Sequence, residues 1–589
     1  MPLLLRFLMA FSLAFLLSAQ PSIVQAQSPN IKSSPPFETV ADHQSITLEW
    51  ESDTEGHSVV KYGLTEDLEE GKRSIEEESA SHEITIDDLE PATIYNMKVG
   101  VATESDTGWS DKLIVSSGSH EEATQEVNVY FNGTIYEEAA TSETATAEHN
   151  FADQYIERID AARESIDITF YNLSQDVGSK ITDALINAAR RGLYVRVVMH
   201  HNLSSQANQN RNRLDNQAGI EVIQSDAGPN EGRSGLMHNK FAIFDYEDDD
   251  PQNTWVVVSS WNSTDTGTYD QYQNMIEFQD PALAGGYRTE FNQMFGSEGH
   301  SPSASDARFS RNKEIVNPTR FWIGDKELSL YFSPQANSEG RIIEHLEKAQ
   351  NDIALPTYLI TRNEYVDALE NLHNDGIEVR GAIGDKSYNE SLYDRLSGFA
   401  DVHDHRAARD NEGQRYPLLH HKSALIDPMN PDDGNGHVIT GSMNWSRNGN
   451  QFSDENTLII RDDHITNLYF QEFAARYQDA GGETDLRLTS SPDDPVVEKP
   501  EEFSVDQNYP NPFNPVTKIT FSLPEPETVT VEIFDLTGRL VETPVNQQQL
   551  QSGTHEMSFD GSRLSSGTYI YTVTLGSGES ISRNMTLIK

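Results

Sequence analysis

Short runs of alternating apolar and polar residues occupy both ends of the chain. Between residues 37 and 117 they include Ser45–Trp50 and Tyr95–Val101, and turn-forming residues separate them. Period-two alternation of this kind indicates antiparallel strands that bury one face. A similar series fills residues 503–589. We therefore expect a small all-β sandwich near each end of the chain.

The middle of the chain alternates strand-like and helix-like patterns. A helical spacing of apolar residues precedes the strand Asp167–Tyr171, and the amphipathic helix Ser179–Arg191 precedes the strand Tyr194–Met199. This β-α-β-α-β order predicts an α/β sheet with helices on its faces. The same order returns further along. We therefore expect two pseudo-symmetric α/β/α halves, at residues 125–298 and 318–480.

A polar pattern is repeated in these halves at a constant offset in numbering, 420 − 238 = 182. Each copy has His-x-Lys, four further residues and Asp, then Ser-x-Asn and a later Asn. The pairs are His238 and His420, Lys240 and Lys422, Asp245 and Asp427, Ser260 and Ser442, Asn262 and Asn444, and Asn274 and Asn456. A fixed offset over so many polar positions indicates two copies of one structural unit.

Length and composition limit the class of protein. The 589 residues exceed what one core supports, so three or four domains are expected. The absence of cysteine excludes disulfides, thiol catalysis and Cys-ligated metals. The net charge is 43 − 94 = −51, which disfavours nucleic acid and anionic membranes unless local basic sites or high salt intervene. Acidity of this kind is also typical of proteins from saline habitats.

Two segments have the composition of targeting or connecting sequence. Residues 1–26 combine a basic start, an apolar run and a small-residue site at Ala26, which predicts a signal peptide. A membrane anchor is the alternative, but it needs a longer apolar span. No other stretch could cross a bilayer, so we expect no integral span after signal removal. Residues 483–502 are rich in Asp, Pro, Ser and Glu and predict a linker.

The repeated polar residues suit chemistry on a phosphodiester. Two such units side by side place two His, two Lys and two Asn around one centre. Neutral imidazole can act as nucleophile or proton carrier near neutral pH. Lys and Asn donate hydrogen bonds to anionic oxygens. Because the lysines supply positive charge, we expect neither a metal nor another cofactor.

The pattern is the double HKD motif, and both halves together resemble the phospholipase D superfamily. That resemblance implies phosphodiester cleavage through a covalent phosphohistidine, with the motif residues as the catalytic set: His238, Lys240, Asp245, His420, Lys422 and Asp427. It makes the histidines nucleophile and general acid, and the aspartates structural or orienting. Phosphate binding and support falls to Ser260, Asn262, Ser442 and Asn444. The His-orienting positions are Glu455 and, at the same offset, Gln273.

The Glu455 and Gln273 pair makes the two copies unequal. A carboxylate on imidazole Nδ1 raises its basicity more than an amide does. The family assigns the nucleophile to the first His, whereas the position of Glu455 in the second copy favours His420. Both assignments stay open at this point.

The two β regions resemble known modules. Trp50 and a tyrosine-corner pattern at residues 89–95 resemble a fibronectin type III domain, an immunoglobulin-like fold with a spacer or binding role. The segment Asp506–Pro515 and the strands after it look like the C-terminal sorting domain of the type IX secretion system. This resemblance implies contact with that secretion machinery and a secreted or cell-surface location. A plain adhesive module is the alternative.

Weaker signals allow further binding sites. Arg233 and Arg415 stand before the two motifs and could hold a second phosphate or a head group, or could be solvated loop residues. His403 with His405 lacks a third metal ligand at useful spacing. Two acidic stretches, residues 248–250 and 432–433, do not follow the calcium-loop pattern and are expected to be acidic turns.

Taken together, the sequence predicts an exported phosphodiesterase of the phospholipase D type with phospholipids as first substrate. A nuclease of the same superfamily is the alternative, with nucleic acid as substrate. A non-catalytic exported binding or adhesion protein is an alternative from a different class, but the complete motifs in both halves disfavour it.

Overall fold

The computed structural model divides the chain into two compact units, Met1–Leu488 and Thr489–Lys589. It describes residues 29–32, 39–225, 235–409, 413–430, 434–488, 503–505, 507–508, 510–524, 527–550, 553–561 and 564–588. The predicted signal peptide and residues 489–502 of the predicted linker lie outside the described residues.

The N-terminal strands join into one hydrogen-bonded sheet. Their bounds are β1 Thr39–Asp42, β2 Ser45–Gly63, β3 Gly71–Ile86, β4 Ile94–Ala102, β5 Thr107–Trp109 and β6 Leu113–Ser116. Two predicted strands, 45–50 and 59–62, form the single strand β2, because an irregularity between Glu51 and Gly56 bends the strand without ending it. Side chains from both parts of β2 enter one core with Trp50 and Tyr95.

The predicted tyrosine corner is present, since the Tyr95 hydroxyl accepts a hydrogen bond from the Glu90 N–H at 2.9 Å. The classification of this segment as fibronectin type III-like, and of both flanking regions as immunoglobulin-like sandwiches, stays a prediction.

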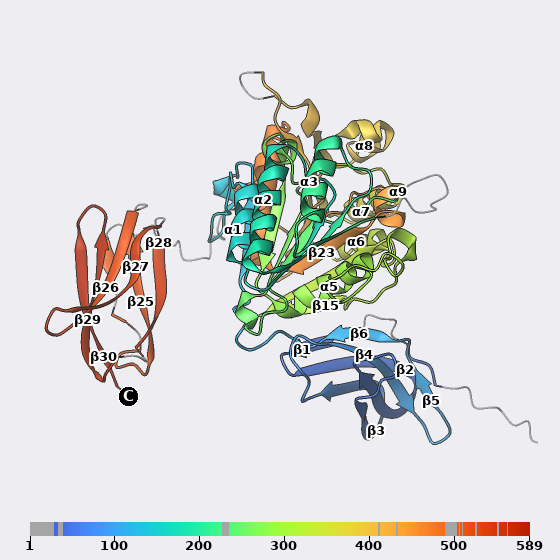
Figure 1. Cartoon of the computed structure of the whole chain (residues 1–589), viewed down its shortest axis with the longest axis horizontal. Coiled ribbons are helices and arrows are strands. Elements are labelled where there is room, and N and C mark those ends of the chain that lie inside the picture. The colour runs from blue at the N-terminus through green and yellow to red at the C-terminus, as the bar shows by residue number, and fades with distance from the viewer. Residues whose placement is uncertain are drawn as a thin grey trace, which may run out of the picture. The chain divides into compact units, whose positions relative to one another are not determined.

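The first half is a mixed sheet with the helices α1 (Phe151–Ala161), α2 (Gln175–Arg191) and α3 (Ser205–Asp215) on one face (Figure 1). The strand order is β10 (Ile220–Gln224), β9 (Tyr194–Met199), β8 (Ser165–Phe170), β11 (Phe241–Phe244), β12 (Trp255–Ser259), β14 (Asn274–Phe278) and β7 (Val127–Phe131). Three strands, β10, β9 and β8, run parallel, and β11 reverses the direction. The helices α1 and α2 pack side by side, and α3 packs on α2.

The second half repeats this plan. Its strand order is β15 (Arg320–Ile323), β16 (Lys326–Ser333), β23 (Glu455–Arg461), β22 (His437–Gly441), β21 (Ala424–Ile426), β17 (Asp352–Thr357), β18 (Glu378–Ile383) and β19 (Asp401–Asp404). The helices α6 (Ser338–Leu346), α7 (Asn363–Asn374) and α8 (Glu390–Leu396) belong to this half. The prediction of a duplicated α/β fold is confirmed, with element boundaries within a few residues of those expected.

One hydrophobic core joins the two halves. It contains one face of each sheet and the helices α5 (Pro281–Phe295) and α10 (Asp463–Asp479). Successive residues of a strand point to opposite faces, so Phe241 and Ile243 enter this shared core. Ala242 and Phe244 instead pack under α1 and α2. Because both strand faces are covered, β11 is apolar throughout, and the two halves are held as one body.

The C-terminal unit consists of β-strands. One sheet has the order β24 (Ser504–Val505), β25 (Val516–Leu523) and β28 (Gly553–Asp560), and the other has β27 (Leu540–Leu550), β26 (Glu527–Asp535), β29 (Gly567–Leu575) and β30 (Ser580–Leu587). A core that includes Phe521, Ile533 and Tyr571 lies between them. This agrees with the period-two pattern read from the sequence.

Candidate functional site

Short backbone pairings between the halves bring the two motifs together. Met237 forms a parallel bridge with Asp454, and the His238 N–H donates to the Asp454 carbonyl at 2.9 Å. In the other direction, β13 (Gln271–Tyr272) pairs with β20 (Leu418–Leu419). Each motif histidine therefore lies beside the chain segment that carries the orienting residue of the opposite half.

The orienting contacts cross between the halves. His238 Nδ1 lies 2.7 Å from Glu455 Oε2, and His420 Nδ1 lies 3.0 Å from Gln273 Oε1. The premise that Glu455 orients His420 is wrong, because the carboxylate of the second half contacts the histidine of the first. Which histidine is the nucleophile stays a prediction. In the sequence Glu455 belongs to the same repeat as His420. The pairing of Met237 with Asp454, however, places Glu455 beside His238.

Serine hydroxyls support both orienting groups. The Ser442 hydroxyl donates to Glu455 Oε2 at 2.7 Å, and the Ser260 hydroxyl donates to Gln273 Oε1 at 2.7 Å. Glu455 is 1% exposed and Gln273 fully buried. The two predicted serines therefore hold the Glu455 carboxylate and the Gln273 amide in position.

The two motif lysines are placed identically. Lys240 Nζ donates to the His238 carbonyl at 2.7 Å, and Lys422 Nζ donates to the His420 carbonyl at 2.5 Å. Both side chains are at most 3% exposed. Burial lowers the pKa of Lys240 to about 7 and lowers that of Lys422 well below its ordinary value. An anion that enters the site restores the preference for the charged form of both lysines.

Burial and the lysine charges also act on the acid–base groups. Desolvation, and then Lys240 and Lys422, lower the pKa of His238 well below its ordinary value. Desolvation and the same lysines lower the pKa of His420 likewise. Burial raises the pKa of Glu455 to about 8, against the opposing effect of Lys240. Clustering of strongly perturbed groups is typical of a functional site.

The two asparagines of the Ser-x-Asn pairs have unsatisfied oxygens. Asn262 Oδ1 and Asn444 Oδ1 are buried and have no hydrogen-bond partner among the described residues. An unsatisfied buried amide costs about 1–3 kcal/mol unless a ligand contacts it. Amide oxygen and nitrogen exchange places by a rotation of the side chain, so either atom can face a ligand. Both amides are therefore positioned to bind a polar group.

The motif aspartates lie at the far ends of their strands. Asp245 accepts backbone N–H groups of Arg163 at 2.9 Å, Glu164 at 2.8 Å and Ser165 at 3.2 Å. Burial raises its pKa despite these hydrogen bonds. Seven residues separate it from His238, roughly 20 Å of extended chain. The structure therefore does not bring Asp245 into the histidine cluster, and its contacts are those of a backbone anchor.

A second buried layer lies under the histidines. Asn456 Nδ2 donates to Asn239 Oδ1 at 3.0 Å, and Asn239 Nδ2 contacts Glu290 at 3.3 Å. Glu290 forms an ion pair with Lys313. The Asn456–Asn239 hydrogen bond joins the two halves, as the contacts of the orienting residues do. It therefore helps to fix one half against the other next to the site.

The second copy builds the equivalent layer from different residues. His421 Nε2 contacts Glu472 Oε1 at 3.0 Å, and Arg476 Nη1 lies 3.3 Å from the same oxygen. Glu472 and Glu290 are related by the offset of the repeat, 472 − 290 = 182, so the acid is repeated while its partners differ.

Sequence analysis missed three aromatic residues at the site. The Tyr171 ring lies 4.7 Å from that of His238, and the Tyr358 ring 4.9 Å from that of His420. Lys240 and Lys422 each lie 5.1 Å from the corresponding tyrosine ring. His200 adjoins Tyr171 and accepts the Met237 N–H at Nδ1. A signal existed, because Tyr171 and Tyr358 each follow the matching strand, β8 or β17.

The weaker sequence signals lie apart from this cluster or outside the described residues. Arg415 is exposed, and Arg233 and residues 432–433 are outside the described residues. His403 contacts Asp401 at 2.9 Å. Asp250 caps a turn beside Asp248, as expected for an acidic turn. Across the described residues, no three His, Asp or Glu side chains are grouped as a metal site requires.

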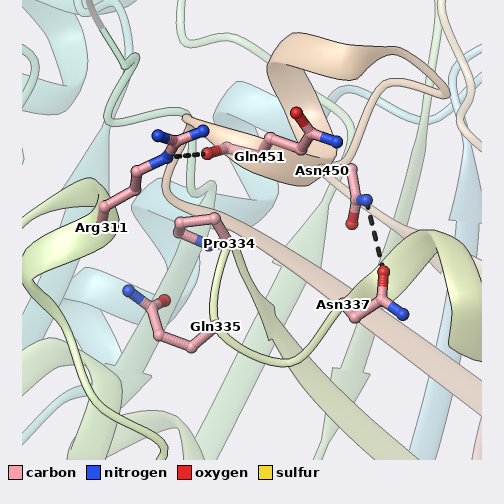
Figure 2. A pocket seen from close by; sticks show the side chains of 6 residues that line it. All are labelled: Arg311, Pro334, Gln335, Asn337, Asn450 and Gln451. Carbon is pink, nitrogen blue, oxygen red and sulfur yellow. Dashed lines mark hydrogen bonds between the residues drawn. The ribbon is translucent and has the colours of Figure 1, made fainter. Parts of the chain in front are cut away.

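A pocket of about 370 Å³ lies on the second half, next to the segment that leads into Glu455. It is lined by Arg311, Pro334, Gln335, Asn337, Asn450 and Gln451 (Figure 2). The Arg311 Nε–H donates to the Gln451 carbonyl at 3.0 Å, and Asn450 Nδ2 lies 3.4 Å from Asn337 Oδ1. Apart from Pro334, the lining side chains are amides and a guanidinium, with no carboxylate among them.

Comparison with known families agrees with the duplicated fold. The model described as "Cardiolipin synthase, PLD-like domain" matches residues 155–295 and again residues 342–477. The model described as "Secretion system C-terminal sorting domain" matches residues 507–587. The chain therefore contains two copies of the PLD-like domain of the phospholipase D superfamily, and residues 507–587 form a type IX sorting domain. This domain implies export.

Individual relatives are distant. Mitochondrial cardiolipin hydrolase of Xenopus tropicalis is 29% identical over 139 residues, which cover 24% of this chain and 60% of that protein. Phospholipase D of Rickettsia prowazekii is 28% identical over 177 residues, covering 28% of this chain and 80% of that protein. The chain spans 60–62% of the length of the cardiolipin hydrolases of X. tropicalis and Chlamydomonas reinhardtii.

Among solved structures, phosphatidylserine synthase of Haemophilus influenzae matches with a TM-score of 0.44 and 16% identity, covering 62% of this chain and 88% of that one. In the described part of the chain, no helix has the length and apolar character needed to span a membrane.

Exchanging the orienting residues is expected to move the nucleophile. In the double variant E455Q/Q273E the carboxylate contacts His420 and the amide contacts His238, and Gln271 can rotate its amide to donate to the carboxylate introduced at position 273. We expect a covalent phosphoenzyme on His238 in the unaltered protein and on His420 in the double variant. Peptide mapping after an acid-free quench measures the position. A label that stays on His238 contradicts the view that the carboxylate selects the nucleophile.

Proposed function

We propose that the protein is an exported phosphodiesterase of the phospholipase D type that hydrolyses phospholipids through a phosphohistidine. The observation that carries this proposal is the pair of buried histidines whose Nδ1 atoms are held by Glu455 and Gln273 of opposite halves. With Nδ1 committed, Nε2 is the ring nitrogen left for substrate in each histidine, and the charges of Lys240 and Lys422 act on both rings. This arrangement suits one anionic group flanked by a nucleophile and a proton donor.

In the first step, His238 Nε2 attacks phosphorus, and the bond between phosphorus and the leaving oxygen breaks. Glu455 accepts the Nδ1–H of His238 and stabilises the positive charge that forms on the ring. His420 gives its Nε2 proton to the leaving oxygen. Desolvation, and then Lys422 and Lys240, lower the pKa of His420. A bound negative phosphodiester offsets the effect of the two lysines and so favours the protonated form of His420 in the complex.

In the second step, His420 accepts a proton from water as the water oxygen attacks phosphorus. The bond from phosphorus to His238 breaks, and the phosphate product leaves with both rings restored. Lys240, Lys422, Asn262 and Asn444 donate hydrogen bonds to the non-bridging oxygens throughout. The lysines supply the positive charge that the transition state needs, so no step is assigned to a metal.

The relatives support the reaction class, since those of Rickettsia are named phospholipase D and the others cardiolipin hydrolase. The net charge of −51 supports a lipid over a long polyanion as substrate. The sorting domain supports action outside the cell.

A direct assay offers the purified protein phosphatidylcholine vesicles and plasmid DNA, each with EDTA. We expect choline release at a rate that EDTA does not change, and little nicking of DNA. DNA cleavage without choline release would mean that the substrate is nucleic acid and not phospholipid. Loss of all activity in EDTA contradicts the metal-free steps, and absence of turnover on both substrates contradicts the proposed function.

A further inference from the structure

The buried ring of Phe452, three residues before Glu455, is contacted by two arginines. Arg311 lies with its guanidinium carbon 4.2 Å from the ring centroid, and Arg447 at 5.8 Å. Both are tied to Gln451, Arg311 through the backbone carbonyl and Arg447 through Oε1, each at 3.0 Å. Ring and amide contacts fix the orientation of each guanidinium and leave other N–H groups available for a ligand.

Neither guanidinium forms an ion pair with a carboxylate in the described part of the chain. This is notable in a protein with 94 acidic residues against 43 basic ones. Two acids that contact neighbouring residues are already engaged: Glu339, whose N–H donates to Asn450, pairs with Arg362, and Asp454, which accepts the Ser310 N–H, pairs with Lys313. The positive charge of the two arginines is therefore not neutralised locally, and the amides beside Arg311 add donors and acceptors.

The pocket adjoins the catalytic centre along the chain. Arg447 begins the helix α9 (Arg447–Gln451), three residues after Asn444. Phe452 precedes Glu455 by three residues, a span of at most about 11 Å. A group bound between the arginines therefore lies within reach of the substrate whose phosphodiester contacts the histidines.

The first half lacks the counterparts of Arg447 and Phe452. At the offset of the repeat, Arg447 corresponds to Asp265, and Phe452 corresponds to Asp270. Asp265 is also engaged, since its Oδ1 accepts the Val177 N–H at 2.8 Å. The duplication preserves the reacting groups but not Arg447 and Phe452, so the two ends of a bound substrate meet different side chains.

We propose that Arg311 and Arg447 form a subsite for a second phosphate group, carried by the same substrate molecule as the scissile phosphodiester. The proposal rests on the proposed function and adds the substrate class to it: molecules with a second phosphate within about 10 Å of the first. Guanidinium groups bind phosphate through paired N–H donors, and the Phe452 ring that both contact reduces the freedom lost on binding.

Two matched substrate pairs, each differing by one phosphate, test this subsite. One pair is the p-nitrophenyl ester of thymidine 5′-phosphate with and without a 3′-phosphate. The other is phosphatidylglycerol and phosphatidylglycerol phosphate in detergent micelles. We expect the member with the extra phosphate to have a KM at least about tenfold lower in one of the pairs. That pair also identifies a nucleotide or a lipid as the source of the second phosphate.

The variants R311A and R447A are expected to bring the ratio of the two KM values in that pair close to one. R308A is the matched control, because Arg308 is exposed three residues earlier and contacts only backbone carbonyls. It keeps the ratio of the unaltered protein. Equal KM values within both pairs for the unaltered protein overturn the subsite, as does a preference that survives both arginine variants.

Turnover of bis(p-nitrophenyl) phosphate, which has a single phosphate, separates the two levels of inference. If the unaltered protein hydrolyses it but shows no preference within either pair, the subsite is wrong and the proposed reaction stands. If the protein hydrolyses no phosphodiester, the proposed function itself fails.

Discussion

Replacing His238 with alanine is expected to abolish turnover and to leave no covalent intermediate, because the attacking nitrogen is gone. Replacing His420 with alanine has a different result on a p-nitrophenyl ester. That leaving group departs without an acid, so one equivalent of p-nitrophenolate appears as a burst and the phosphohistidine persists. Steady turnover falls by about 1,000-fold or more in both variants. Burst amplitude and the mass of the His238 peptide are the measurements.

The matched control for these variants is H345A. His345 is also a buried histidine, but its ring neighbours that of His437 and belongs to neither motif. The H345A variant should keep the turnover of the unaltered protein. This result would show that the loss of a buried imidazole does not by itself abolish turnover in H238A and H420A. A burst and a stable label in H238A, with none in H420A, reverse the two roles. Near-normal rates in either variant contradict a shared site.

Replacing Asp427 with alanine is expected to destabilise the first compact unit by about 4 kcal/mol. Its carboxylate accepts backbone N–H groups of Gln350, Asn351 and Asp352 at 2.7–3.1 Å, which alanine leaves buried without a partner. The residue also has φ of 49°, a left-handed conformation that alanine adopts less readily than aspartate. Thermal unfolding of the protein measures the loss.

The milder variant D427N separates anchoring from chemistry. Asparagine keeps one carbonyl oxygen for the three N–H groups and tolerates the left-handed conformation, so most stability remains. Its turnover per folded molecule should stay close to that of the unaltered protein. A fall in kcat as large as that of H420A, without loss of folding, means that Asp427 takes part in proton transfer.

The repeated motif made most of the site predictable. His238, Lys240 and Asn262 recur at one constant offset, and equal spacing on equal strands leads to equal placement. The helices and strands around them follow from periodicity, since the apolar faces of α2 and β8 have distinct periods. The role of Asp245 as an anchor was also predicted, as an orienting residue outside the proton transfers.

The crossed contacts could not be predicted, because they depend on which segments of distant sequence pair. Nothing local to Glu455 indicates that Asp454 bridges Met237. Tyr171 and Tyr358 were missed for a related reason. Their offset is 358 − 171 = 187 and not 182, because the loops between strands and motifs differ in length, so the repeat does not connect them. At the end of an apolar strand, an aromatic residue is more often part of a core.

The exchange of orienting residues between halves bears on the history of the chain. A single half contains a reacting imidazole but supplies its carboxylate or amide to a neighbour, so an ancestral single copy had to work as a symmetric pair. In such a pair both positions are encoded once and must be the same residue. Fusion of two copies into one gene removes that constraint. Positions 273 and 455 could then diverge, and a symmetric catalyst could become one with a fixed direction of attack.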